Sequence, residues 1–221
     1  MKKAFTMIEL VLVIIIVGII SATIVPQIGK TSLDRCAQQV LHHIRYTQHL
    51  AMMDNKFDPN DQYWYRSRWQ IKFQKNSGEI VYTIFNDKNS THGYNGNAST
   101  VLIKNEIAKN PLNPKQLLTG LSASSKINTK EMNLKRKYNI NQISFSQSCS
   151  VCVAGHCSKN LIFDQIGRPL YGKSNSLNHP YRINNGIRLV ENKCTITLTD
   201  TDNNSRKIVI MPETGYSYIE D

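Results

Sequence analysis

The hydrophobic residues of the chain fall into three patterns. An almost unbroken apolar run extends from Phe5 to Val25, with Glu9 as its one charged residue. Apolar residues then recur at steps of three and four up to about residue 57, and from Trp69 onward they alternate with polar ones. A continuous run of this length is typical of a membrane-spanning helix, the second pattern of an amphipathic helix and the third of β-strands.

The first two patterns predict one long N-terminal helix. At 1.5 Å per residue, a helix over residues 5–25 spans roughly 30 Å, the thickness of the hydrocarbon core of a bilayer. Pro26 removes a helical hydrogen bond, so we expect a kink there. The amphipathic continuation over residues 26–57 would pack on a domain formed by residues 58–221. Its apolar stripe consists of Leu33, Ala37, Val40, Leu41, Ile44 and Ala51.

The alternating pattern predicts an antiparallel sheet. Trp69, Ile71 and Phe73 alternate with polar residues, residues 76–78 provide a turn, and the alternation resumes at Ile80, so this segment reads as a β-hairpin. We expect further strands at 140–146, 160–164, 186–191, 194–199, 206–211 and 215–219, with a turn at 202–204. The expected fold class is therefore α+β: a long N-terminal helix, apolar half in the membrane, followed by a C-terminal antiparallel β-sheet domain.

A basic insertion at about 86–139 interrupts the strand pattern. Residues 86–99 read as a loop, and residues 104–139 hold eight lysines and arginines against two glutamates, with room for one short helix. The whole chain carries a formal charge of +11. Such a surface attracts anionic partners, nucleic acid among them, or only keeps the domain soluble. Lys135, Arg136 and Lys137, next to Tyr138, are the candidate DNA contact.

The first ten residues carry a specific motif. They read Met1-Lys2-Lys3-Ala4-Phe5-Thr6-Met7-Ile8-Glu9-Leu10. This segment resembles the precursors of type IV pilins and of the pseudopilins of type II secretion. The resemblance implies that a prepilin peptidase removes the leader, residues 1–4, between Ala4 and Phe5 and methylates the new amine of Phe5. The family usually has Gly before the cut, where this chain has Ala4. An ordinary secretory signal, cleaved near residues 21–23, is the alternative.

Glu9 has a role in assembly if the resemblance holds. A carboxylate within a spanning segment costs about 2.5–3.5 kcal/mol on insertion scales and usually has a partner. The Phe5 amine of a neighbouring subunit could supply the counter-charge and set the position of each new subunit. In the alternative, Glu9 extends to the membrane interface and pairs with nothing.

Three segments carry a narrower resemblance to GspH/FimT-type minor pseudopilins: residues 48–52, residues 161–169, and residues 206–210 with 214–216. It implies a minor pseudopilin, a structural subunit of a type II secretion or type IV pilus-like machine. The alternative is a DNA-binding minor pilin of a DNA-uptake apparatus. Some FimT-type pilins bind DNA through Gly-Arg-x-Arg, but residues 215–218 here are Gly-Tyr-Ser-Tyr, without either arginine.

The resemblance also implies partners and a location. The partners are other pilin or pseudopilin subunits, the prepilin peptidase/methyltransferase and an inner-membrane assembly platform. The expected location is the inner membrane, with a single pass, the N-terminus cytoplasmic before processing and the C-terminal domain periplasmic. No nucleophile elbow, HExxH pair or phosphate-binding loop stands in the sequence, so we expect no enzyme, no cofactor and no metal.

Five cysteines complete the set of candidate residues. Cys149, Cys152, Cys157 and Cys194 would form two disulfides in an exported domain, and three pairings are open. A zinc site of Cys149, Cys152, His156 and Cys157 and a set of free thiols are the alternatives. Cys36 would be left over, either as plain packing or for an intermolecular bond.

Overall fold

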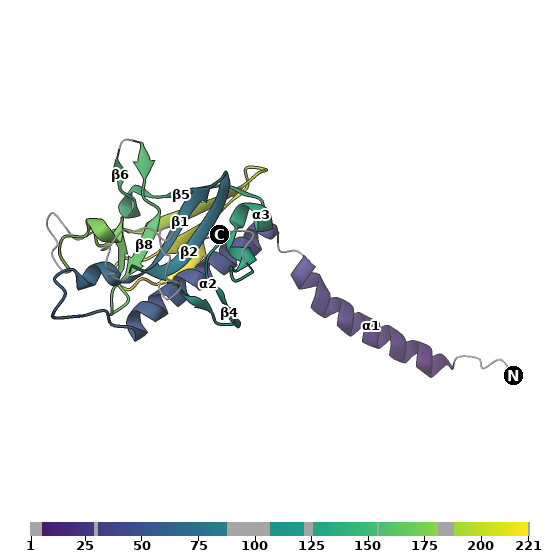
Figure 1. Cartoon of the computed structure of the whole chain (residues 1–221). Coiled ribbons are helices and arrows are strands. Elements are labelled where there is room, and N and C mark those ends of the chain that lie inside the picture. Colours follow the sequence, from purple (N-terminus) through teal and green to yellow (C-terminus); the bar gives the residue numbers. More distant parts are fainter. Residues whose placement is uncertain are drawn as a thin grey trace.

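The computed structural model describes residues 6–28, 31–87, 107–121, 126–153, 155–180 and 188–220, with the backbone alone at 21–28, 153 and 156. Helices α1 (Met7–Ile28) and α2 (Ser32–Met53) precede a β-rich domain, which also contains the short helix α3 (Leu134–Tyr138). Figure 1 shows that α1 stands away from this domain, whereas α2 lies along it. The overall class is α+β.

The prediction of one long N-terminal helix is wrong, because α2 has a start of its own. The Thr31 hydroxyl accepts a hydrogen bond from the Asp34 N–H at 3.1 Å, and the Asp34 carboxylate accepts one from the Thr31 N–H at 3.2 Å. This reciprocal capping box satisfies N–H groups that the first turn leaves without helical partners. It fixes the beginning of a separate helix at Ser32.

The prediction of a membrane-spanning helix is also contradicted. Within the described ranges, no helix combines the length and the apolar character that crossing a membrane requires. This finding overturns the spanning helix expected over 5–25 and the expected single-pass inner-membrane location with a periplasmic domain.

The amphipathic helix is confirmed, with narrower bounds than the expected 26–57. Helix α2 contacts strands of both large sheets. It buries one stripe, which consists of Leu33, Cys36, Ala37, Val40, Ile44, Thr47 and Ala51. Five residues of this stripe were expected from the three- and four-residue spacing. The stripe therefore forms one wall of the main hydrophobic core.

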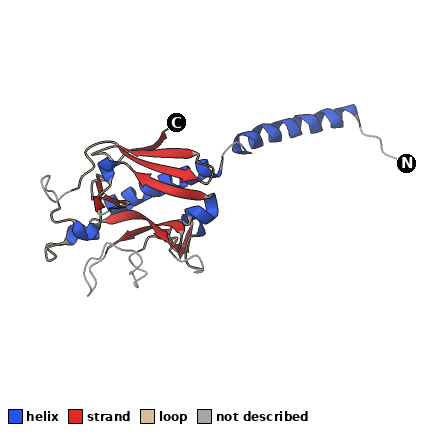
Figure 2. Ribbon diagram, turned by 90° about the horizontal axis from the view of Figure 1, so that it is seen from above, coloured by secondary structure: helices blue, strands red, loops and turns tan. Residues whose placement is uncertain are grey.

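Two four-stranded antiparallel sheets form the domain around α2 (Figure 2). The first has the order β2 (Glu79–Asn86), β1 (Trp69–Asn76), β8 (Asn160–Phe163) and β9 (Pro169–Tyr171). The second has the order β12 (Ser217–Glu220), β11 (Ser205–Ile210), β10 (Cys194–Asp200) and β5 (Ile140–Phe145). Two small hairpins pair β3 (Lys109–Asn110) with β4 (Asn113–Leu117) and β6 (Cys152–Val153) with β7 (His156–Cys157).

Most of the predicted strands are confirmed. The β1–β2 hairpin turns at Ser77 and Gly78, both at positive φ, as a two-residue hairpin loop requires. The strand expected at 186–191 is wrong where it is described, because Leu189 forms only an isolated bridge with Leu170. Residues 186–187 lie outside the described part of the chain. Strands β3, β4, β6, β7 and β9 were not predicted. Four of them have two or three residues, too few to show alternation, and the five residues of β4 are mostly polar.

The basic insertion is partly integral to the core. Its residues 107–121 run along the outer edge of β2, where the Ile84 N–H donates to the Leu118 carbonyl at 3.0 Å. The Gly120 N–H likewise donates to the Tyr82 carbonyl at 3.0 Å. Leu118, Met132 and Leu134 are fully buried. This segment therefore covers an edge strand that would otherwise expose unpaired backbone groups. Residues 88–106 lie outside the described ranges.

Candidate functional site

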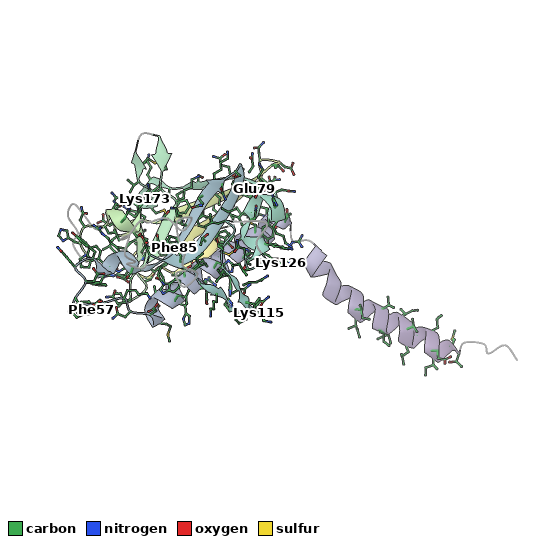
Figure 3. The ribbon with its side chains drawn as sticks, in the orientation of Figure 1. Phe57, Glu79, Phe85, Lys115, Lys126 and Lys173 are labelled. Atoms are coloured by element: carbon green, nitrogen blue, oxygen red, sulfur yellow. A yellow bond between two sulfur atoms is a disulfide. The ribbon has the colours of Figure 1, made fainter. Side chains whose placement is uncertain are left out.

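Helix α1 carries a continuous apolar surface that nothing in the described chain covers. Its side chains stand out on all sides of the helix in Figure 3. Their exposed fractions run from 46% at Ile16 to 87% at Met7. The members of this apolar surface of α1 are Met7, Ile8, Leu10, Val11, Leu12, Val13, Ile14, Ile15, Ile16, Val17, Ile19 and Ile20.

Glu9 lies at the start of α1 and is bound locally. Its carboxylate accepts hydrogen bonds from the Thr6 N–H at 2.8 Å and from the Thr6 hydroxyl at 2.9 Å, and the Glu9 N–H donates to that hydroxyl at 3.4 Å. This pattern is a capping box, like that of Thr31 and Asp34. The predicted cleavage residues Ala4 and Phe5 lie outside the described residues. Pro26 lies within α1, which ends at Ile28, but its side chain is outside the description.

The three segments that carry the narrower resemblance meet at one residue. The side-chain amide of Gln48 donates to the carbonyl of Gly167 at 2.9 Å and to that of Thr214 at 2.8 Å. Gly167 and Gly215 both have positive φ, and a Cβ on Gly215 would lie 2.5 Å from the Gln48 amide nitrogen. Glycine at both turns therefore allows the chain to pass close to the end of α2.

A partly buried polar network, which the sequence did not reveal, joins α2 to β2 and α3. The side-chain amide of Gln39 donates to the phenol oxygen of Tyr82 at 2.8 Å and to the Glu131 carbonyl at 3.0 Å. The Tyr138 hydroxyl donates to the Gln39 carbonyl oxygen at 2.5 Å. His43 contacts the same Tyr82 oxygen. The one sequence signal is the spacing of four between Gln39 and His43, beside the apolar stripe of α2.

The prediction of two disulfides is confirmed, and the structure selects one of the three pairings. Cys149 bonds to Cys194, and Cys152 bonds to Cys157. All four sulfur atoms are therefore bonded in pairs, so none is a thiolate that could hold zinc in this state. Among the described residues, no three histidine, cysteine or acidic side chains are grouped so that they could bind a metal ion.

Cys36 is the free cysteine, and it belongs to the core. It is fully buried in the stripe of α2. Burial raises the pKa of its thiol to about 12, which keeps it protonated and unreactive at neutral pH. This placement favours the packing interpretation over an intermolecular bond.

The predicted DNA-contact residues lie together on α3, but each has a local partner. The Lys135 ammonium donates to the Gly78 carbonyl at 3.0 Å, and Arg136 forms an ion pair with Glu79. Lys137 lies 3.8 Å from the Glu131 carboxylate. The neighbouring Tyr138 is buried, so its ring is not available to stack on a base. A phosphate would have to compete with these contacts for the three cations.

A groove of about 440 Å³ lies between α2 and the β3–β4 hairpin. Its charged lining residues are Lys109 and Lys115, and the rest of its lining is apolar or aromatic, with Tyr46, Leu50 and Trp69 on one side. Among the described residues that line it there is no histidine, carboxylate or thiol, although its two lysines and Tyr46 are side chains of types that can act in proton transfer.

Comparison with known proteins gives no relative: no protein-family model, no curated protein and no solved structure matches the chain.

Proposed function

We propose that the chain is a minor pseudopilin, a structural subunit that assembles through α1 with other pilin-like subunits of a type II secretion or type IV pilus-like machine. The observation that carries the proposal is the exposed apolar surface of α1. A helix that is hydrophobic all round is normally buried. Exposed apolar patches of this kind mark sites where another surface binds.

The apolar surface of α1 determines what kind of partner fits. Its side chains are aliphatic apart from Met7, and they surround the helix rather than forming one stripe. A single globular partner with one flat face would leave most of them exposed. Several apolar helices packed around α1 would cover all of them. A bundle of the same kind of helix from neighbouring subunits has this geometry.

Glu9 gives this assembly its register. In the free chain its carboxylate is held by Thr6 at the first turn of α1. Helix packing would desolvate this charge, so an opposite charge must lie nearby. The methylated amine of Phe5 on a neighbouring subunit is the counter-charge that the N-terminal motif implies. Pairing of the two would align each subunit with the next.

One further observation supports a structural role. The segments that resemble minor pseudopilins, far apart in the sequence, converge on Gln48. The DNA-binding alternative has no such support, because the α3 cations are engaged by Glu79, Glu131 and the Gly78 carbonyl.

The proposal is tested by crosslinking from α1 in cells that contain the natural partners. A photo-crosslinking residue at Ile16 should capture pilin-like proteins, and mass spectrometry should find a methylated Phe5 as the mature N-terminus. Glu9→Val should be processed normally but lose the crosslinks, whereas Glu9→Asp should keep them as the matched control. A mature chain that starts at Met1 or near Thr23, or crosslinks that include no pilin-like protein, would contradict the proposal.

A further inference from the structure

The two disulfides differ sharply in their exposure to solvent. Cys149 and Cys194 are both fully buried, in the main core. Cys152 and Cys157 are both exposed, and they pair across the β6–β7 hairpin, which projects from the domain in Figure 1. A thiolate attacks a disulfide only when it can reach one of the sulfur atoms. The outer disulfide is therefore the accessible one.

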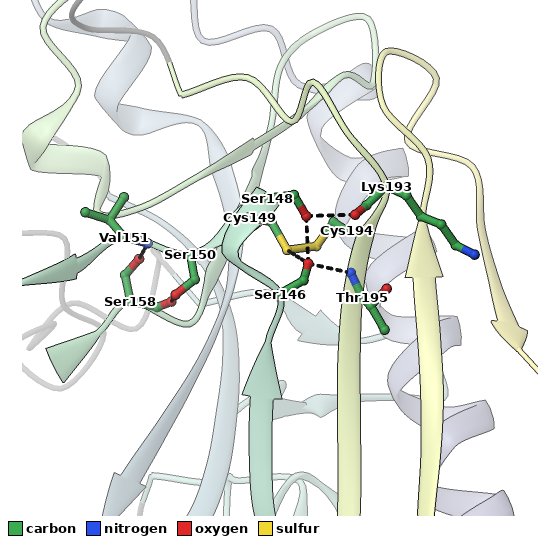
Figure 4. Close-up of a disulfide and its surroundings, with 9 residues drawn as sticks. All are labelled: Ser146, Ser148, Cys149, Ser150, Val151, Ser158, Lys193, Cys194 and Thr195. Carbon is green, nitrogen blue, oxygen red and sulfur yellow. Dashed lines mark hydrogen bonds between the residues drawn. A yellow bond between two sulfur atoms is a disulfide. The ribbon is translucent and has the colours of Figure 1, made fainter. Parts of the chain in front are cut away.

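The base of this hairpin is held independently of the outer disulfide. The Ser158 N–H donates to the Val151 carbonyl at 2.8 Å, and the Val151 N–H donates to the Ser158 hydroxyl at 3.1 Å. The Ser150 hydroxyl donates to the Ser158 carbonyl at 2.9 Å. Figure 4 shows Ser150, Val151 and Ser158 next to the buried Cys149–Cys194 bond. Opening the outer disulfide would therefore free the hairpin tip and leave the domain intact.

The sequence around the hairpin carries no negative charge. No aspartate or glutamate stands between Glu131 and Asp164, and Lys159 follows Cys157 by two residues. An attacking thiolate therefore meets no carboxylate from this segment.

We propose that the Cys152–Cys157 disulfide is a thiol–disulfide exchange site that reacts with a dithiol partner. A partner thiolate bonds to one of the two sulfurs, and the other sulfur leaves as a thiolate and takes a proton from water. The partner's second thiol then attacks the mixed disulfide. Two electrons pass to this chain, which ends with two thiols, and the partner ends with a disulfide. Cys149–Cys194 does not take part.

The experiment uses the full chain under native conditions with dithiothreitol as the dithiol. After brief exposure, free thiols are alkylated with N-ethylmaleimide and located by peptide mass spectrometry. We expect label on Cys152 and Cys157, at a rate at least tenfold higher than on Cys149 and Cys194. Circular dichroism should show an unchanged fold. Glutathione, a monothiol, should give a mixed disulfide on Cys152 or Cys157 alone.

The variant Cys152→Ser/Cys157→Ser provides the control. It should fold and show no labelling at the same dithiothreitol concentration, which would exclude slow opening of the inner disulfide as the source of thiols. Equal rates of reduction at the two disulfides, or no reduction until the domain unfolds, would overturn the proposal. Neither result would affect the proposed assembly through α1, because α1 contains no cysteine.

Discussion

The imidazole Nδ1 of His43 lies 2.6 Å from the phenol oxygen of Tyr82, which is fully buried. The Gln39 amide donates to the same oxygen. With the imidazole neutral, Nδ1 can accept the Tyr82 hydroxyl proton. Burial, followed by the nearby His42, lowers the pKa of His43 to about 4. The network is thus built around an uncharged histidine.

His43 should make the domain less stable in acid. In the unfolded chain it takes up a proton near its ordinary pKa of 6.5, whereas in the folded domain it does so only near 4. The unfolded state therefore binds more protons between these values, and stability falls as the pH falls from 6.5 to about 4. The slope is at most about 1.4 kcal/mol per pH unit. Urea unfolding at several pH values measures it.

The variant His43→Gln should flatten this pH dependence, although it should also be less stable at pH 7.5 because the contact with Tyr82 changes. The exposed His49 offers the matched control, since His49→Gln should keep the slope of the parent chain. An unchanged slope in His43→Gln would show that His43 does not control acid stability.

Whether an element of this fold can be predicted depends on how far apart in the sequence the residues that determine it lie. The stripe of α2 and the β1–β2 hairpin are local patterns, and both were predicted. The separate start of α2 depends on the side chains of Thr31 and Asp34. A prediction from hydrophobic periodicity alone does not take this capping signal into account. Edge coverage by Leu118 depends on contact between distant segments, which periodicity does not contain.

The segment that covers β2 should matter for stability despite its basic composition. Leu118 is fully buried against the core, so Leu118→Ala should cost about 2–5 kcal/mol. Leu112, in the same segment, is 96% exposed, and Leu112→Ala should change stability by less than about 0.5 kcal/mol. Chemical denaturation of both variants measures the difference. Equal, small effects would show that residues 107–121 are a detachable insertion.

The two disulfides should contribute unequally to stability. The inner bond joins residues 45 positions apart and the outer bond residues 5 apart. The chain-entropy relation gives about 4 kcal/mol for the longer loop and about 2 kcal/mol for the shorter one. Cys149→Ala/Cys194→Ala should therefore be destabilised more than Cys152→Ala/Cys157→Ala in urea unfolding. The reverse order would show that strain or residual structure, rather than loop length, determines their effects.

The sequence identified the candidate site residues but not their partners in the fold. The four paired cysteines were identified by residue type alone, but their pairing needed the positions of β5, β6 and β10. The cluster on α3 was identified by charge alone, and its partners Glu79 and Gly78 come from a turn more than fifty residues earlier. Composition therefore located the charged groups without showing whether they are free.

The DNA-binding alternative predicts a salt-dependent affinity to which the three cations of α3 contribute. If Lys135, Arg136 and Lys137 bind phosphates, replacing all three with Ala should shallow the slope of log affinity against log salt by up to about 2–3 units, because fewer counterions are released. Fluorescence anisotropy with a labelled duplex at several salt concentrations measures this slope. Sequence preference should be weak, since a five-residue helix is too short to read a groove.

A second variant separates DNA binding from simple charge. Glu79 holds Arg136 and also accepts a hydrogen bond from Asn133. Glu79→Gln keeps a hydrogen-bond acceptor for Asn133 and removes the competing charge, so a cluster that binds phosphate should bind DNA more tightly.

The control replaces Lys193, Arg206 and Lys207 with Ala. It removes as much positive charge as the α3 variant does, and these three cations also have acidic partners. If this control weakens binding as much as the α3 variant does, the affinity comes from net charge. If the parent chain binds no DNA at low salt, the α3 cations serve only their contacts with Glu79, Glu131 and Gly78, and the uptake alternative loses its basis.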